Sequence, residues 1–457
     1  MTLQLRIAVI VLSISSTGSI PTHAQATWKA GAARQKITPA QPMWMSGYAG
    51  RNQPAQGTLH DLWAKALVLE DEAGAKAVLI TLDLVGIDRE TSQVICREIE
   101  KRHQLPREAV AICTSHTHTG PVVGTNLMSM YRKKLSDEEK QRIVDYTKSL
   151  QKNVAGAVDQ AMKNLAAAKI TYGLGRATFA VNRRNNREAD VPMLREKGEL
   201  KGPVDHEVPV LTVRDSAGKL TAIVTGYACH ATVLSFYQWS GDWPGFAQIE
   251  IEKDHPGAIA LFWAGCGADQ NPLPRRTVEL AENYGRQLAD AVRQVTAKEM
   301  KPLEGKLRLH YQEIDLPLGE LPTRDQLEAD TESKNEYIAA RAEMLLKQWD
   351  KNGQLPNTYP YPVQLWELGD EVDFAILGGE VVVDFSLRLK NEWKAGELWV
   401  AGYANDVMAY IPSRRVLQEG GYEGATSMIY YGLPTVWSPK VEDLIVETLL
   451  KLKKSKK

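Results

Sequence analysis

The sequence predicts an α/β fold, in which mixed β-sheets with hairpins are flanked by helices in one large domain. Three pairs of short apolar runs are each joined by a polar turn, as in β-hairpins: AKALVLE with KAVLITLD, VPVLTVRD with LTAIVTGYA, and VQLWELG with VDFAILGG. Apolar residues recur at helical spacing over 89–103, 138–165, 243–254, 277–298, 323–350 and 439–455. Hairpins mixed with helices favour mixed sheets with helical layers over a purely parallel sheet.

Length and one charged segment bear on the number of domains. At roughly 150 residues per domain, a chain of 457 residues would form about three. A charged helix over 323–350 and a loop rich in proline and tyrosine over 351–362 can form a linker between domains or an excursion within one. The motifs described below occur on both sides of this segment. We therefore predict one catalytic domain over 27–457.

The composition is that of a globular protein with ample apolar material for a large core. Hydrophobic residues make up 44% of the chain and charged residues 24%. The formal net charge is −1, so the charge balance gives no reason to expect binding to nucleic acid.

The first 26 residues, MTLQLRIAVIVLSISSTGSIPTHAQA, have the pattern of a secretory signal. One arginine precedes a short apolar stretch, and small residues follow at an A-x-A-like cleavage site. The apolar stretch is too short to span a bilayer, and an uncleaved anchor is the alternative. We predict a signal peptide over 1–24, a periplasmic or secreted location, and no transmembrane segment in the mature chain.

Export permits disulfide bonds, and the chain has four cysteines, Cys96, Cys113, Cys229 and Cys266. They show no zinc-finger spacing. Cys229 and Cys266 each lie where an apolar strand meets a polar loop, so they are the favoured pair. Buried free thiols are the alternative.

Histidines follow two apolar strands. In EAVAICTSHTHTGP, His116 and His118 come after a buried run, and in TGYACHATV His230 does the same. Residues two apart in an extended segment face the same way, so both imidazoles can approach one metal, or one can bind metal while the other meets a substrate. The alternative is polar loop residues that bond to the backbone. Two such strand ends favour a shared site, because active sites of α/β proteins gather where strands end.

Acidic and tyrosine residues occupy comparable positions. Glu380 follows FAILGG, where glycines permit close backbone approach; the alternative is an acid that complements a helix N-terminus. Asp269 lies in FWAGCGADQNP, which lacks the Lys-Ser/Thr ending of a phosphate-binding loop. Tyr410 and Tyr422 lie in a glycine-rich stretch and alone indicate nothing, because tyrosines are common in cores.

Taken together, these segments resemble the N-terminal catalytic domain of the neutral/alkaline non-lysosomal ceramidases, from about Gly31 to Trp437. The family's ordered motifs correspond to GAARQKITP at 31–39, SHTHTGP at 115–121, Asn182-Arg183, HATV at 230–233, SGDWPG at 240–245, Gly379-Glu380, YIPS at 410–413 and YEGATS at 422–427. No single motif is decisive, but the ordered set is specific.

The resemblance implies a zinc ion and a set of residues around it. The implied metal ligands are His116, His230, Glu380 and Tyr410. Two neutral imidazoles and a carboxylate suit zinc, which would activate water for attack on a carbonyl. By the same resemblance, the residues placed at the scissile amide, where they would stabilise an oxyanion or protonate the leaving group, are His118, Arg183 and Tyr422.

The chain departs from the family pattern in two places. The family loop GDVSPN carries a serine implicated in catalysis, whereas GADQNP at 267–272 has none. We therefore expect a zinc-activated water, with Asp269 or Gln270 orienting water or substrate. The chain also ends before the family's C-terminal immunoglobulin-like domain, which disfavours a substrate buried in a membrane.

Aromatic residues cluster beside the presumed metal loop at Phe236, Tyr237, Trp239 and Trp243. They can stack on sugar rings, pack on acyl chains or fill the core. The leading hypothesis is an exported zinc amidohydrolase with a small-molecule or lipid-like N-acyl substrate of the ceramide type. The alternatives are a zinc hydrolase of carbohydrate-derived or ester substrates, and a metal-stabilised binding protein without turnover. Residues beyond the bare ligands favour an enzyme.

Overall fold

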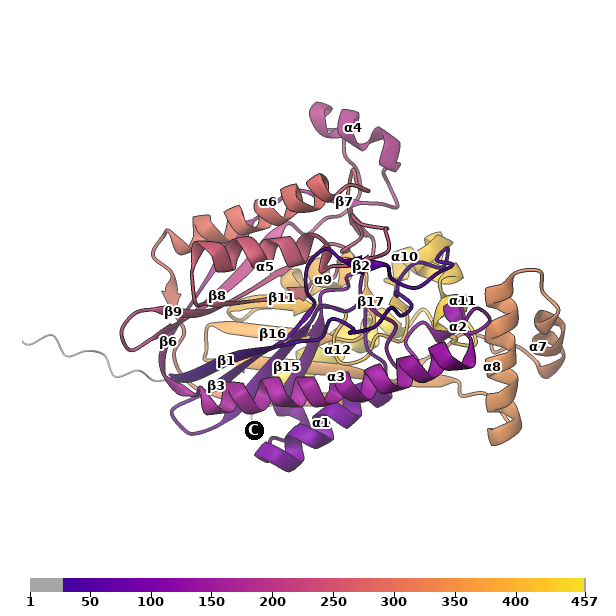
Figure 1. Ribbon diagram of the computed structural model, residues 1–457, viewed down its shortest axis with the longest axis horizontal. Coiled ribbons are helices and arrows are strands. Elements are labelled where there is room, and N and C mark those ends of the chain that lie inside the picture. Colours follow the sequence, from indigo (N-terminus) through magenta and orange to yellow (C-terminus); the bar gives the residue numbers. More distant parts are fainter. Residues whose placement is uncertain (1–27, 456–457) are drawn as a thin grey trace, which may run out of the picture.

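The computed structural model describes residues 28–455, so the predicted signal peptide over 1–24 lies outside the described residues. Two sheets form its centre (Figure 1). The strands of the larger sheet run in the order β11-β9-β8-β6-β1-β3-β4-β5, with β13 beside β6. Their bounds are β1 Trp28–Lys36, β3 Trp63–Glu70, β4 Lys76–Leu82, β5 Val110–Thr114, β6 Ala166–Arg176, β8 Glu207–Asp215, β9 Leu220–Tyr227, β11 Ile259–Ala264 and β13 Lys301–Pro302.

The smaller sheet has the order β14-β15-β16-β18, with bounds Leu307–Pro317, Thr358–Leu368, Val372–Leu377 and Glu397–Ala401. Its side chains face those of the larger sheet across a shared core. Leu67 and Trp263 from one sheet pack there with Trp366, Phe374 and Trp399 from the other. Burial of such large side chains between the sheets is the main source of stability at this interface.

Helices cover the outer faces of both sheets, giving four layers. On the larger sheet lie α1 (Arg89–His103), α3 (Asp137–Lys163), α5 (Asp242–Asp254) and α6 (Val278–Thr296). On the smaller sheet lie α9 (Val383–Glu392) and α12 (Val441–Lys454). Within the described residues, no helix has both the length and the apolar character needed to cross a membrane.

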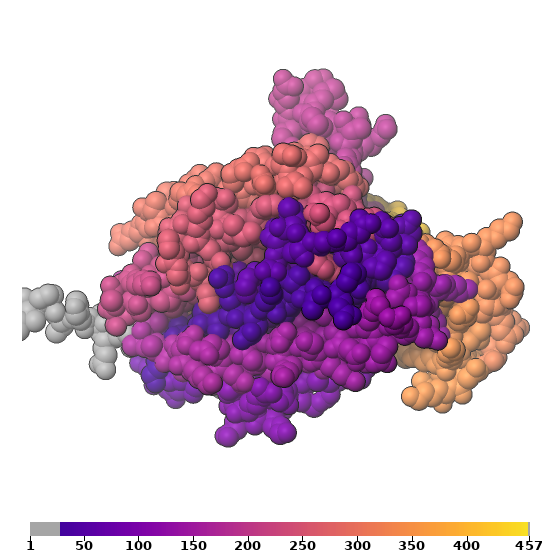
Figure 2. Space-filling view, in the orientation of Figure 1, coloured from indigo at the N-terminus to yellow at the C-terminus, as the bar shows by residue number. Residues whose placement is uncertain are grey.

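Shorter elements connect these layers. The strands are β2 Gly57–Thr58, β7 Ala180–Asn182, β10 Gln238–Trp239, β12 Gln270–Pro272, β17 Glu380–Val381 and β19 Tyr410–Ile411. The helices are α2 Met128–Tyr131, α4 Val191–Lys197, α7 Arg324–Thr331, α8 Glu336–Asn352, α10 Arg414–Glu419 and α11 Met428–Tyr431, with 3₁₀ turns at Arg107–Ala109 and Glu188–Asp190 and a π-helical turn at Tyr422–Thr426. In Figure 2, α4 and the α7–α8 segment stand out from the body.

The predicted α/β class with mixed sheets is confirmed, as are all three hairpins, now β3–β4, β8–β9 and β15–β16. The single helix predicted over 323–350 is wrong. It is divided into α7 and α8, because the Asn335 side chain accepts hydrogen bonds from the backbone N–H groups of Tyr337 and Ile338 and starts a new helix.

The loop predicted over 351–362 is also partly wrong, because β15 already begins at Thr358. Pro360 and Pro362 pair with β14, whereas β16 pairs only with Val363–Leu368. The first part of β15 therefore has one open edge, where proline's missing N–H costs no ladder bond. Since β14 and β15 pair along their full length, the segment between them is an insertion in one hairpin.

The predicted Cys229–Cys266 disulfide is wrong, because all four cysteines are buried free thiols. Cys229 packs in the core between the larger sheet and α5–α6, and Cys266 packs in the core of the smaller sheet. The two thiols therefore lie in different hydrophobic cores.

Candidate metal centre and active site

The ends of strands from both sheets meet at one buried point. His116 and His118 follow β5, and His230 follows β9, in the larger sheet. Glu380 begins β17 directly after β16 of the smaller sheet, and β17 pairs in parallel with β19, which sets Glu380 opposite Tyr410. A bridge between Thr117 and Ala231 ties the two histidine loops together. The four residues predicted as ligands come from segments far apart in the sequence, and the structure brings them together.

The donor atoms of this cluster lie close to one another. Glu380 Oε2 is 3.2 Å from His116 Nε2 and 3.1 Å from His230 Nε2. The Tyr410 hydroxyl lies 3.4 Å from His230 Nε2, and His118 Nε2 lies 3.1 Å from His116 Nε2. Donor atoms of the three histidines all lie within 4.8 Å of one another. All five side chains are buried.

Second hydrogen bonds fix how the two ligand-type imidazoles point. His116 Nδ1 lies 2.6 Å from the Val85 carbonyl oxygen, and His230 Nδ1 lies 2.8 Å from the Gly267 carbonyl oxygen. A carbonyl only accepts, so each Nδ1 carries the proton and each Nε2 presents a lone pair toward Glu380. Backbone carbonyls orient metal-binding histidines in this way.

The arrangement fits a cation. Burial, together with the charge of Arg183, lowers the pKa of His230 to about 4, so its Nε2 carries no proton at neutral pH. Glu380 Oε2 has no hydrogen-bond donor, although it is buried against two imidazole nitrogens. Unprotonated nitrogens facing a carboxylate repel it unless a positive ion lies between them.

Backbone strain collects around the same point. Four residues adopt the left-handed backbone region, which residues other than glycine rarely occupy. They are His116, Asp242, Tyr403 and Asn405, with φ values of 57°, 53°, 53° and 61°. Such residues cost about 1–3 kcal/mol each and cluster at functional sites. The prediction that His116 and His118 converge is therefore right in outcome, but they meet through a left-handed turn at His116 and not through extended alternation.

His118 is the most exposed of the three histidines, at 8%. Its ring packs against Tyr48, with ring centroids 4.7 Å apart, and its Nδ1 has no hydrogen-bond partner. Burial lowers the pKa of His118 well below its ordinary value, and the neighbouring imidazoles of His116 and His230 lower it further. A neutral His118 can donate its ring N–H to a substrate or add a third imidazole nitrogen to the cluster.

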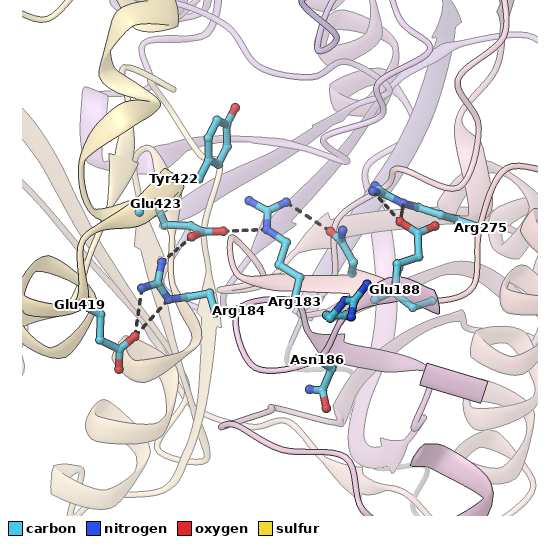
Figure 3. Close-up of a pocket in the computed structure, with 12 residues that line it drawn as sticks. Arg183, Arg184, Asn186, Glu188, Arg275, Glu419, Tyr422 and Glu423 are labelled. Atoms are coloured by element: carbon cyan, nitrogen blue, oxygen red, sulfur yellow. Dashed lines mark hydrogen bonds and ion pairs between the residues drawn. The ribbon is translucent and has the colours of Figure 1, made fainter. Parts of the chain in front are cut away.

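Arg183 links the cluster to a cavity beside it (Figure 3). One terminal nitrogen lies 3.2 Å from the Tyr410 hydroxyl and the other 3.3 Å from Asn271 Oδ1. Its Nε donates to Glu423 over 2.7 Å. The guanidinium also lies 5.6 Å from the ring centre of Tyr422, which is 41% exposed. The predicted residues Arg183 and Tyr422 therefore both border the cluster, and Tyr422 faces the opening.

Asp269 is buried beside the backbone of Arg183. Its carboxylate accepts from Asn182 Nδ2 over 3.0 Å and from the Val383 N–H over 2.9 Å, and its carbonyl accepts from the Arg183 N–H over 2.8 Å. Burial raises the pKa of Asp269 to about 6. With its oxygens bonded this way, Asp269 positions Arg183 and joins the loop to α9. The predicted orienting of water or substrate by Asp269 has no geometric support.

Sequence reasoning missed several side chains that complete the site. Tyr431 donates a short hydrogen bond to Glu380 Oε1. The Tyr403 ring packs against the His116 ring, with ring centroids 4.2 Å apart. Glu423, next to the predicted Tyr422, anchors Arg183. The YEGATS motif contained Glu423, whereas nothing marks Tyr403 or Tyr431 as special among sixteen tyrosines.

The aromatic cluster beside the metal loop divides between core and surface. Trp239 and Trp243 are buried, and Trp243 Nε1 donates to the His230 carbonyl over 2.8 Å. Trp243 thus holds the backbone of a predicted ligand. Core packing, one of the alternatives for these tryptophans, is the correct interpretation.

The sequence profile of the family "Neutral/alkaline non-lysosomal ceramidase, N-terminal" matches residues 28–268. The chain belongs to this family. Among curated ceramidases, it is similar to the neutral ceramidase of Pseudomonas aeruginosa, with 24% identity over 237 residues, which are 49% of this chain and 33% of that protein. The neutral ceramidase of Drosophila melanogaster is 26% identical over 259 residues, 53% of this chain and 35% of that protein.

Solved ceramidase structures share the fold. A structure described as a ceramidase complexed with C2 has a TM-score of 0.72 at 16% identity, covering 93% of this chain and 75% of that one. The crystal structure of the Pseudomonas aeruginosa neutral ceramidase has a TM-score of 0.71 at 18% identity, covering 93% and 74%. The chain spans about a third of the length of the curated ceramidases it matches in sequence.

Proposed function

We propose that this ceramidase-family chain is an exported, zinc-dependent hydrolase of amide bonds in N-acyl compounds. The observation that carries the proposal is that Glu380 Oε2 lies within 3.2 Å of both His116 Nε2 and His230 Nε2, with a tyrosine hydroxyl and an arginine beside them. Two imidazoles, one carboxylate and a phenol oxygen are a ligand set that zinc accepts. The export proposal rests on the pattern of residues 1–24 alone.

His116, His230, Glu380 and Tyr410 would hold the metal, and a zinc ion in such a set supplies a Lewis acid and an activated water. Arg183 points its terminal nitrogens at the same region, so it can donate to a carbonyl oxygen as negative charge develops there. His118, kept neutral by burial, can accept a proton from the attacking water and pass that proton to the departing amine. Tyr422 stands at the opening, where it can position the substrate.

A substrate screen with the zinc-loaded protein tests this function. The compounds are N-octanoylsphingosine, N-octanoylglycine, an octanoylated sugar ester and simple anilides, and released octanoate or amine is measured. We expect at least one amide to be cleaved and Glu380→Gln to lower kcat/KM by more than about 10³-fold, because one ligand is lost. Glu332→Gln, at an exposed position, is the matched control.

Each other result points elsewhere. Cleavage of the sugar ester alone would replace the amidase proposal with an esterase. Bound zinc without turnover of any compound would favour a metal-stabilised binding protein.

A further inference from the structure

We propose that the cavity beside the candidate metal centre binds an anionic group of the substrate, a carboxylate or a similar oxyanion. The inference rests on the proposed hydrolase function and narrows it: the amides that this chain cleaves best would carry a negative charge. The cavity has a volume of about 560 Å³, enough for the polar part of a small molecule.

The walls of this cavity are polar. Four arginines line it, Arg183, Arg184, Arg187 and Arg275, and Leu273 is the one aliphatic side chain among the described residues that form its walls. In Figure 3, Arg184, Glu419, Glu423 and Tyr422 lie on the left, Arg275 and Glu188 lie on the right, and Arg183 lies between them. A sphingoid alkyl chain gains little in such a place, because it would strip water from guanidinium groups without replacing their hydrogen bonds.

Carboxylates balance these arginines only in part. Glu423 is shared by Arg183 and Arg184, at 2.7 and 2.6 Å, and Glu188 is 3.0 Å from Arg275. Glu419 is shared between Arg184 and Arg415, at 2.9 Å from each. Three glutamates therefore face four arginines in the walls, which leaves a positive excess.

Arg187 accounts for that excess. Its Nε lies 3.9 Å from Asp190 Oδ2, and its side chain is 85% exposed, so this ion pair is weak. Its fork of N–H donors suits a carboxylate, phosphate or sulfate. Arg183 at the inner end reaches the Tyr410 hydroxyl, so an anion held in the cavity would place a nearby amide at the metal centre.

Matched substrates test the charge preference. N-Octanoylglycine and N-octanoylglycinamide differ by one carboxylate on the amine side, and glutaryl-anilide and pentanoyl-anilide differ by one on the acyl side. We expect kcat/KM to be at least about tenfold higher for the charged member of one pair at low salt. The preference should shrink as ionic strength rises, because exposed charges are screened beyond about 10 Å at 0.1 M salt.

Arg187→Ala locates the effect. We expect it to raise KM for the preferred anion about tenfold, with kcat little changed, and to reduce the preference for charge. Arg286→Ala is the matched control. Arg286 is also weakly paired, 3.7 Å from Glu282, and its side chain is 52% exposed, but it lies on α6 outside this cavity, so the preference should persist. Equal rates within both pairs, or faster cleavage of N-octanoylsphingosine than of either anion, would overturn the inference.

Direct binding separates this inference from the proposed function. If no amide is cleaved, the amidase proposal fails, but calorimetric titration of N-octanoylglycine against N-octanoylglycinamide still tests the cavity. Tighter binding of the carboxylate, weakened in Arg187→Ala and competed by inorganic phosphate, would support the anion site. Equal or undetectable binding of the two compounds would refute it.

Discussion

The Nε2 nitrogen of His230 and the Oε2 oxygen of Glu380 lie 3.1 Å apart, with no proton between them to share. The proton of His230 sits on Nδ1, where the Gly267 carbonyl accepts it. The imidazole cannot turn without breaking that bond, and Trp243 holds the His230 backbone by donating to its carbonyl. The backbone therefore fixes a lone pair opposite a carboxylate, an arrangement that a bound cation would stabilise.

The first prediction concerns the metal. Wild-type protein should carry one zinc per chain, and His230→Ala or Glu380→Gln should carry less than about a tenth of that, measured by elemental analysis. Removing zinc with a chelator should lower the unfolding temperature, because ligand bound only to the folded state stabilises it by about 4 kcal/mol at a thousandfold excess over Kd. Glu332→Gln should retain full zinc. Full occupancy in His230→Ala would remove His230 from the ligand set.

The second prediction concerns the position of the His118 ring. A Cβ atom added at Gly47 would lie 2.5 Å from two atoms of the His118 ring, at a φ of +96°. Gly47→Ala should therefore displace His118 and lower kcat by about 10²-fold, the low end for a lost acid–base group. Gly74→Ala is the matched control, since its φ is +85° but nothing lies within 4 Å of its added Cβ.

The outcome also separates two roles for His118. If it meets only the substrate, Gly47→Ala keeps its zinc while losing rate. Loss of zinc from Gly47→Ala, with Gly74→Ala unaffected, would make His118 a ligand. Unchanged kinetics in Gly47→Ala would leave His118 without either role.

Three of the four implied ligands, His116, His230 and Glu380, could be recognised in the sequence because each follows a local signal. An apolar run ends at Thr114, at Tyr227 and at Leu377, and a histidine or glutamate follows within three residues. The carbonyls of Val85 and Gly267, which orient the imidazoles, have no such signal. Any residue has a carbonyl, and only the folded chain decides where it points.

Parts of the fold escaped prediction for a similar reason. β1 reads WKAGAARQK, without a sustained alternation of apolar and polar residues, and β6 reads AAAKITYGLGR, in which alanines and glycines weaken the strand signal of an alternating run. Their place is set by partners: β1 pairs with β3 over eight residues, and β6 pairs with β8 over nine. Tertiary pairing overrides weak local propensity in such strands.

The third prediction is a pH effect on stability at Asp406. The pKa of this carboxyl is raised to about 7, chiefly by burial and also by the nearby Asp88, while the Tyr359 hydroxyl, which donates over 2.7 Å, and Arg89 lower it in part. The unfolded carboxyl titrates near about 3.9, so the folded protein binds the extra proton between these values. The stability contributed by protonated Asp406 is therefore lost as pH rises from about 4 to 7.

Comparison with Asp406→Asn isolates this contribution, because the amide stays neutral. The free energy of unfolding of the wild type, relative to the variant, should fall by up to about 1.4 kcal/mol per pH unit across that window. Urea unfolding at pH 5, 6, 7 and 8 measures it. Parallel pH profiles would mean that Asp406 titrates alike in both states.

The fourth prediction tests the single domain proposed over 27–457. β14 and β15 pair over eleven residues on either side of the α7–α8 insertion. A protease that cuts between Gly353 and Asn357 should therefore leave two fragments that stay associated in size-exclusion chromatography and keep their zinc. Separation into two independently folded fragments would show two domains.

The last prediction concerns the serine that the GADQNP loop lacks. Gln270 is buried, with its Nε2 donating to the Ala228 carbonyl over 2.5 Å and its Oε1 accepting from the Asp205 N–H over 3.0 Å. Both ends of the amide bond to backbone, and Gln270 is fully buried and does not line the cavity beside the cluster. The predicted orienting role for Gln270 thus has no geometric support.

No other described serine is placed to act as the nucleophile in its stead. Within residues 28–455, no serine hydroxyl forms a hydrogen bond to His116, His118 or His230, the contact that would activate it as a nucleophile. Ser240 Oγ instead bonds to Thr119 over 2.7 Å, and Ser413 Oγ accepts from the Val416 N–H at the start of α10. We therefore expect no covalent acyl-enzyme.

Pre-steady-state kinetics on a chromogenic anilide should thus show no burst of released amine at the level of enzyme concentration. A serine-directed fluorophosphonate should leave the rate unchanged, and Ser413→Ala should lose stability by about 1 kcal/mol, the usual cost of a lost helix cap, while keeping kcat. Chelation should abolish the rate and added zinc restore it. A stoichiometric burst, with probe labelling that tracks inactivation, would require a serine nucleophile, and mass spectrometry of the labelled peptide would identify which one.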